Sequence, residues 1–169
     1  MLVLIEKEKM QAQPQLPKLC FPVSNFKLKQ EGGKYSVYDF SRKKYVALTS
    51  EEWVRQNCLH YLHYFKNFPI NLLSVERSIK LNNLVLRYDI VAYSKMAKPV
   101  LLVECKAPDV RISQETFDQI AAYNLELKVP YLLVTNGIEL LCCSVDFINS
   151  RYYFLKEVPD YHTVKGLAK

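Results

Sequence analysis

The chain has 169 residues, of which 50% are hydrophobic and 24% are charged, and its formal net charge is +6. This balance is typical of a single soluble globular domain, and no apolar run reaches the ~20 residues that a membrane helix needs. The five cysteines form no CxxC pair, which argues against a zinc site or a disulfide framework, and the first residues lack the apolar segment of a secretory signal. We therefore expect a cytoplasmic protein with no membrane partner.

The chain divides into three parts. Residues 1–25 contain Pro14, Pro17 and Pro22 and are expected to form an extended arm, residues 26–159 a single domain, and residues 160–169 a C-terminal tail. Alternating residues on both sides of Glu31-Gly32-Gly33 predict a hairpin within 26–39. The basic stretch 41–44 is expected to lie in solvent.

A first helix is predicted to begin after Thr49, because Thr49 and Glu52 have capping-box spacing, and to end before Pro69. Its inward side is predicted to carry Val54, Cys58, Tyr61, Leu62 and Phe65. Glu51 falls within this arc and is a candidate inward-facing acid, whereas Glu52 falls outside it and is interpreted as the cap. His60 and His63 lie on the opposite side and are expected at the surface.

Three strands should follow, at 72–81, 84–93 and 100–106, the last apolar on both faces as in a central strand. A second helix is predicted over 113–128, then strands at 130–135 and 138–145 around the Asn136-Gly137 turn, and an edge strand at 152–155. This order predicts an α/β fold with a mixed sheet flanked by helices.

Charged residues at the end of the buried third strand need compensation. Glu104 and Lys106 are two positions apart and so project to the same face, and antiparallel pairing with the preceding strand would bring Asp89 near Glu104. Two adjacent carboxylates repel each other unless a divalent cation lies between them, and Mg²⁺ prefers carboxylate oxygens. The alternative is structural: a Glu104–Lys106 ion pair, with Asp89 paired to Arg87 or Arg77.

Five segments in this order, TSEEWVRQ, RYDIVAY, LLVECKAP, QIAAYN and VTNG, resemble the N-terminal domain of the restriction (R) subunit of type I restriction enzymes. Asp89 with Glu104-Cys105-Lys106 is similar to the PD-(D/E)xK nuclease signature. The resemblance implies a restriction-endonuclease-like mixed sheet flanked by helices, with core order α-β-β-β-α-β and here an extra N-terminal hairpin. It also implies magnesium-dependent DNA cleavage, in which Mn²⁺ can substitute.

The resemblance also implies roles for individual residues. Asp89 and Glu104 would hold the metal, Lys106 would be the catalytic lysine, and Glu51, or alternatively Glu52, would be the acid from the first helix. The pair Gln119 and Tyr123 matches a Q-x-x-x-Y element that lies near the active site and the DNA backbone in similar nucleases, and its spacing places both on one helix face.

Two features depart from the family pattern. Tyr88 replaces the proline before the metal-binding aspartate, and the sequence contains no G-x-x-x-x-G-K-[ST] stretch, so any ATP-driven motor, like any specificity subunit, would be a separate partner. The alternative function is a nucleic-acid-binding or accessory module that keeps the fold and does not cut. The sequence leaves the oligomeric state open, and a dimer is consistent with it.

Overall fold

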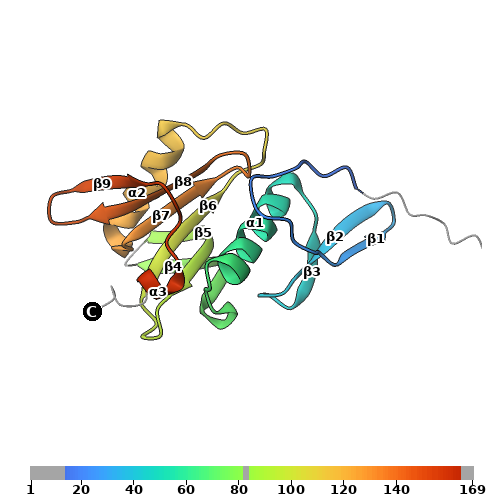
Figure 1. Ribbon diagram of the computed structural model, residues 1–169, viewed down its shortest axis with the longest axis horizontal. Coiled ribbons are helices and arrows are strands. Elements are labelled where there is room, and N and C mark those ends of the chain that lie inside the picture. The colour runs from blue at the N-terminus through green and yellow to red at the C-terminus, as the bar shows by residue number, and fades with distance from the viewer. Residues whose placement is uncertain (1–13, 82–83, 165–169) are drawn as a thin grey trace, which may run out of the picture.

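The computed structural model describes residues 14–81 and 84–164, which form two β-sheets and a small set of helices (Figure 1). The smaller sheet has the order β1-β2-β3 and the larger sheet the order β4-β5-β6-β7-β8-β9. The strands are β1 Leu28–Glu31, β2 Lys34–Asp39, β3 Lys44–Ala47, β4 Leu73–Leu81, β5 Leu84–Tyr93, β6 Pro99–Cys105, β7 Tyr131–Thr135, β8 Leu140–Asp146 and β9 Arg151–Leu155. The helices are α1 Ser50–His60, α2 Gln114–Leu127 and α3 Tyr161–Val164, with a π-helical turn at Tyr61–Phe65 and a 3₁₀ turn at Ile70–Leu72.

The small sheet contains the predicted hairpin and one strand that was not predicted. Gly32 and Gly33 both have positive φ, as the tight β1–β2 turn requires. The chain then turns again and forms β3, which pairs antiparallel with β2. The prediction that residues 41–44 lie in solvent is wrong for Arg42, whose side chain is 14% exposed and ion-paired to Asp39. The alternation of apolar and polar residues did not predict the burial of Arg42, because Asp39, the buried side chain that it pairs with, is also charged.

Helix α1 lies between the two sheets and is therefore buried on more than one side (Figure 1). Thr49 caps its first turn by accepting a hydrogen bond from the Glu52 amide at 3.0 Å. Val54, Cys58 and Leu62 are fully buried, as predicted, whereas Phe65 is 47% exposed. His60 was expected at the surface but is only 7% exposed, because the small sheet covers the side of the helix that a single amphipathic stripe would leave to solvent.

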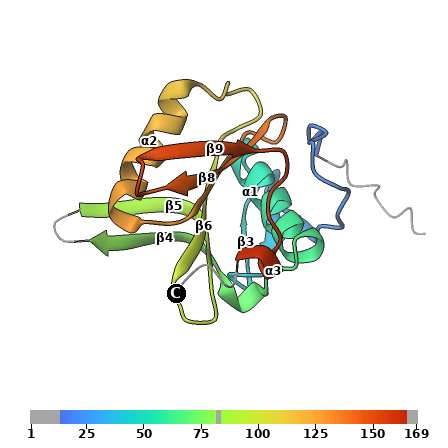
Figure 2. The same ribbon diagram turned by 60° about the vertical axis from the view of Figure 1, so that its left-hand side comes forward.

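The large sheet is mixed, as predicted. Strands β4, β5 and β6 form an antiparallel meander, β6 and β7 are parallel, and β8 and β9 extend the sheet by antiparallel pairing. The parallel step is where α2 crosses over the sheet, since parallel neighbours need a long connection. Helix α2 covers the face opposite α1 (Figure 2), with Phe117 and Ile120 buried against Leu102 of β6 and Val91 of β5.

Both ends of the described chain pack against the domain. Residues 14–25 form no helix or strand, as expected of an arm, but Leu19 and Phe21 join the core on the α1 side of the sheet. The expected tail from residue 160 instead begins with α3, in which Tyr161 and Val164 are buried. The Tyr161 amide donates to Lys66 O at 2.8 Å, which fixes α3 beside the turn after α1. Residues 1–13 and 165–169 lie outside the described part of the chain.

Candidate functional site

The predicted acids lie where the β5–β6 ladder ends. The antiparallel register runs up to Ile90 opposite Val103, and beyond it the carboxylate of Asp89 takes over the role of a backbone acceptor. Asp89 Oδ2 accepts a hydrogen bond from the backbone amide of Cys105 at 2.6 Å. Cys105 lies between Glu104 and Lys106 in the chain. The hydrogen bond therefore holds the Asp89 carboxylate close to the backbone of both residues.

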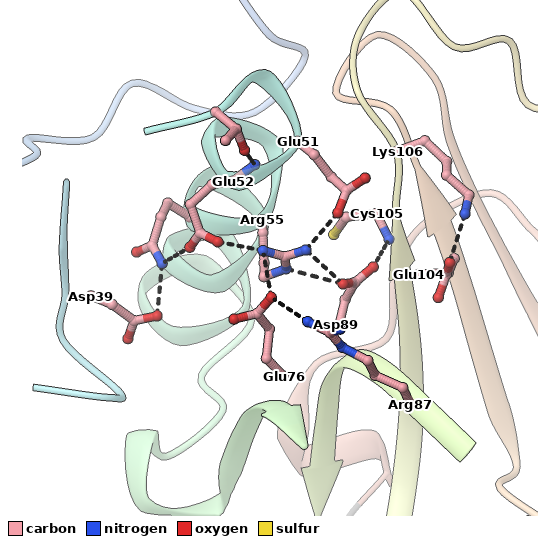
Figure 3. A network of polar contacts seen from close by, with 12 residues as sticks. Asp39, Glu51, Glu52, Arg55, Glu76, Arg87, Asp89, Glu104, Cys105 and Lys106 are labelled. Atoms are coloured by element: carbon pink, nitrogen blue, oxygen red, sulfur yellow. Dashed lines mark hydrogen bonds and ion pairs between the residues drawn. The ribbon is translucent and has the colours of Figure 1, made fainter. Parts of the chain in front are cut away.

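The other oxygen of Asp89 is held by Arg55 of α1. Arg55 Nε and Nη2 both donate to Asp89 Oδ1, at 3.1 and 2.8 Å (Figure 3). The alternative partners considered from the sequence were Arg87 and Arg77, and Arg87 instead pairs with Glu76 at 3.2 Å. Arg55 was not among the partners considered, because its spacing from Glu51 and Glu52 indicates pairs within the helix and not a partner on β5.

Arg55 is also paired with both helix acids. Its side chain is only 5% exposed and contacts Glu51 at 2.7 Å as well as Glu52. Burial opposes the charge on the guanidinium, but the neighbouring carboxylates of Asp89 and Glu52 outweigh it and raise the pKa of Arg55. Arg55 therefore stays charged and joins the N-terminal half of α1 to the middle of β5.

The same network extends to the small sheet. Arg42 pairs with Glu52 on one side and with Glu76 of β4 on the other. Gln56 of α1 donates to Asp39 of β2 at 2.8 Å and to Glu52 at 2.8 Å. These polar contacts connect α1 to both sheets. The position of Asp89 therefore depends on charged side chains of β2, the β2–β3 turn, α1 and β4.

Glu104 and Lys106 form a separate pair. Lys106 Nζ lies 2.8 Å from Glu104 Oε1, and each side chain is 28% exposed. Burial and the nearby negative charge of Asp89 raise the pKa of Glu104, and Lys106 only partly offsets them. The hydrogen bond to Glu104 raises the pKa of Lys106, so the ammonium keeps its protons at neutral pH.

Asp89 and Glu104 lie on different sides of the large sheet. Cys105 belongs to the core cluster under α1 and Leu102 to the cluster under α2, so strand alternation turns Glu104 toward the α2 side. Figure 3 accordingly shows Glu104 and Lys106 across β6 from Arg55 and Glu51. Within residues 14–81 and 84–164, no group of three or more His, Cys, Asp or Glu side chains is arranged to hold a metal ion.

The chemistry of these side chains nevertheless suits Mg²⁺. Asp89, Glu104 and Glu51 offer carboxylate oxygens, the ligands that this cation prefers. The charges of Asp89 and Glu51 both raise the pKa of Glu104, which means that the three carboxylates lie within electrostatic reach of one another. A cation between Asp89 and Glu104 would relieve this repulsion.

The burial of Glu51 and Glu52 is the reverse of the prediction. Glu52, interpreted as the cap, is buried at 5% exposure, and its carboxylate is used by Arg42 and Arg55. Glu51 was expected to face inward, but its side chain is 47% exposed. Glu51 still lies on the Asp89 side of the helix through Arg55, and its charge raises the pKa of Lys106 as well as that of Glu104.

The Q-x-x-x-Y element lies on α2. Gln119 is exposed on this helix, and its contact with DNA stays a prediction. The side chain of Tyr123 lies outside the described residues, although its backbone belongs to α2.

The family model described as "Type I restriction enzyme R protein N terminus" matches residues 50–159. A fragment structure of a putative HsdR subunit of a type I restriction enzyme from Vibrio vulnificus has a TM-score of 0.51 and 18% sequence identity over 69% of this chain. The chain spans about a quarter of that protein, 24% of its length. No curated protein matches.

These findings confirm the predicted fold class, an α/β protein with a mixed sheet flanked by helices, in which the predicted extra N-terminal hairpin is part of a three-stranded sheet. The family match covers well over half of the chain. The chain therefore belongs to the family of type I restriction enzyme R protein N-termini. No helix in the described residues is long and apolar enough to cross a membrane.

Proposed function

We propose that this chain is a magnesium-dependent endonuclease that hydrolyses DNA phosphodiester bonds. Family membership and fold support the nuclease relationship. The observation that carries the proposal is the hydrogen bond from the Cys105 amide to Asp89, which fixes one acid of β5 beside the Glu104-Cys105-Lys106 segment at the end of β6.

Asp89 and Glu104 would hold the metal, with Glu51 as a further acid at its edge. Mg²⁺ bound there supplies Lewis-acid stabilisation of the charge that develops on the phosphate oxygens. Binding would require Asp89, whose side chain is 14% exposed, to release Arg55, and Glu104, which lies on the other side of β6, to turn toward it. This convergence belongs to the proposal.

Lys106 would act as a cation. Nζ carries its proton while it is paired with Glu104, and as an ammonium it would donate hydrogen bonds to the attacking water or to a phosphate oxygen. With Glu104 holding the metal, the Lys106 ammonium would be free to face the substrate. Gln119 and Tyr123 would contact the DNA backbone, and the products would carry 5′-phosphate and 3′-hydroxyl ends.

The test is nicking of supercoiled plasmid in Mg²⁺ or Mn²⁺. Wild type and the exposed-lysine control Lys98→Ala should nick alike, whereas Lys106→Ala and Glu104→Gln should lose activity by about a hundredfold or more, the scale of removing one stabilising donor at a reacting centre. Equal nicking by wild type and Lys106→Ala, prepared in the same way, would remove the catalytic assignment and point to a contaminating nuclease.

A second candidate function is a DNA-binding or accessory module that does not cut by itself and works with separate motor or specificity subunits. The ion pair between Arg55 and Asp89 favours it, because the guanidinium occupies the oxygen that a metal would need. Calorimetric titration separates the two functions. The endonuclease predicts Mn²⁺ binding heat that Asp89→Asn abolishes and Glu139→Gln, at an exposed acid, leaves intact, whereas the accessory module predicts no such heat.

A further inference from the structure

The positive charge of the chain is concentrated in one segment. Residues 14–49, which contain the whole small sheet, carry seven Lys and Arg against two Asp and Glu. Residues 50–164 carry twelve against thirteen and are nearly neutral. The family match begins at residue 50, so the basic segment lies before the part of the chain that the family model covers.

Strand register places much of this charge on one face of the small sheet. Lys29 is opposite Ser36, which is opposite Ala47, and Tyr38 is opposite Tyr45. Lys27 stands just before β1, and its carbonyl accepts a hydrogen bond from the Tyr38 amide at 2.9 Å. By the two-residue period of a strand, Lys34 shares the face of Ser36 and Tyr38. We call this surface, formed by Lys27, Lys29, Lys34, Tyr38 and Tyr45, the basic face.

The basic face is turned away from the domain. On the opposite face of β2, Val37 is fully buried and Asp39 is bonded to Gln56 of α1. Lys27, Lys29 and Lys34 are all exposed, and Tyr45 is 45% exposed. Figure 1 shows the small sheet on the side of α1 away from the large sheet.

The lysines on this face are arranged along the two tyrosine rings. Lys27 Nζ lies 5.8 Å from the centroid of Tyr38, and Lys29 Nζ lies 5.9 Å from that of Tyr45. The two rings meet edge to face at 5.3 Å. Because ammonium groups lie over them, the ring faces are poorly placed for stacking on nucleotide bases, and the surface is better suited to phosphates.

One acid lies among these lysines. Glu31 pairs with Lys29 at 2.6 Å, but both side chains are at least half exposed, and such surface pairs contribute little and are screened by salt. A polyanion can displace Glu31 from Lys29. The face therefore keeps a net positive charge.

We propose that the basic face binds the phosphate backbone of duplex DNA, as a docking surface separate from the acids at the strand ends. Charge complementarity identifies the partner, since three exposed ammonium groups lie on one face of the sheet, where they can contact the phosphates of a DNA backbone. The network of Arg42 with Glu52 and Glu76 ties this sheet to the elements that carry Asp89. DNA held on the face would thus be fixed relative to the candidate site. The proposal goes beyond the cleavage reaction and does not need it.

The experiment measures binding of a fluorescent 30-base-pair duplex by anisotropy in EDTA, where no cleavage can occur, over 50–300 mM salt. The triple variant Lys27→Gln/Lys29→Gln/Lys34→Gln should lose affinity on the order of a hundredfold at 0.1 M salt, and its salt slope should fall by about 2.7, if each lysine neutralises one phosphate. The charge-matched control Lys95→Gln/Lys98→Gln/Lys156→Gln removes three exposed lysines elsewhere and should change affinity only slightly.

Lys27→Arg/Lys29→Arg/Lys34→Arg should bind like wild type, and circular dichroism should show that all three variants are folded. Equal losses in the two glutamine triples would mean that only net charge matters, and would overturn the proposal. Tighter binding of the corresponding single strand would overturn the assignment to duplex DNA. Since binding is read without metal, a protein that binds through this face and cuts nothing would refute the proposed endonuclease and leave the docking surface standing.

Discussion

Replacing Arg55 with alanine should strongly destabilise the protein. The guanidinium is 5% exposed and pairs with Glu52, which is 6% exposed, and with Asp89, which is 14% exposed. Removing one partner of a buried ion pair leaves an uncompensated charge, at a cost of about 3–5 kcal/mol. For a domain of this size, that loss corresponds to a fall in Tm on the order of 6–20 °C.

The assay is urea unfolding followed by circular dichroism, with the exposed-residue variant Arg111→Ala as the matched control. In Arg55→Ala, the uncompensated carboxylates take up protons more readily in the folded than in the unfolded chain, so stability should rise as pH falls, and the loss should be smaller at pH 5 than at pH 8. Adding Glu52→Gln to Arg55→Ala should restore part of the stability, because it removes one of the orphaned charges.

A cost below about 1 kcal/mol would refute this reasoning, since it would mean that the network is solvated and interchangeable like a surface pair. A loss of the same size at both pH values, with no recovery in the double variant, would mean that the lost packing of the arginine stem, and not its charge, is responsible.

Further predictions concern three other positions. Gly137 has φ +80°, and a Cβ there would lie 2.7 Å from Leu19 Cδ2, so Gly137→Ala should lower the free energy of unfolding by about 1–3 kcal/mol, and Leu19→Ala should relieve part of this in urea unfolding. Because burial and Asp89 raise the pKa of Glu104, Mn²⁺ affinity in calorimetry should begin to weaken, as pH falls, at a higher pH than an ordinary glutamate would give, and an affinity that weakens only in the range of an ordinary glutamate would contradict this. Asn124 is 1% exposed and makes two 2.8 Å hydrogen bonds to the backbone after α2, so Asn124→Ala should cost on the order of 2–4 kcal/mol in thermal unfolding, and a change within the error of wild type would contradict it.

The sequence predicted the large sheet well because its strands are long, apolar and bounded by turn signals. The observed β5 has the predicted bounds, β6 differs from the predicted strand by one residue at each end, and β7 differs by one residue at its start. In each of these strands, hydrophobic burial and the residues of the flanking turns favour the same structure. The apolar pattern and the turn residues were therefore sufficient to predict where the strands lie.

The surroundings of α1 could not be predicted in the same way. One stripe of apolar residues suggests one buried side, yet Glu52 and His60 are buried on the other. Glu52 is compensated by arginines, and His60 packs between Phe26 and Phe40, where burial lowers its pKa to about 4. Burial that is stabilised by charge pairing and aromatic contact across distant segments leaves no periodic pattern in the sequence.

The candidate site was predictable in its residue types and less so in its geometry. The spacing of Glu104 and Lys106 correctly places them together, as their 2.8 Å contact shows. The partner of Asp89 came from α1, more than thirty positions earlier, and only the fold could reveal it.

The most direct test of the central claim is anomalous diffraction from a crystal grown in Mn²⁺. The proposed function predicts a peak that lies about 2–2.2 Å from carboxylate oxygens of both Asp89 and Glu104, with Lys106 Nζ turned from Glu104 toward solvent. A fully occupied Mn²⁺ elsewhere, or no peak while Arg55 still holds Asp89, would contradict it.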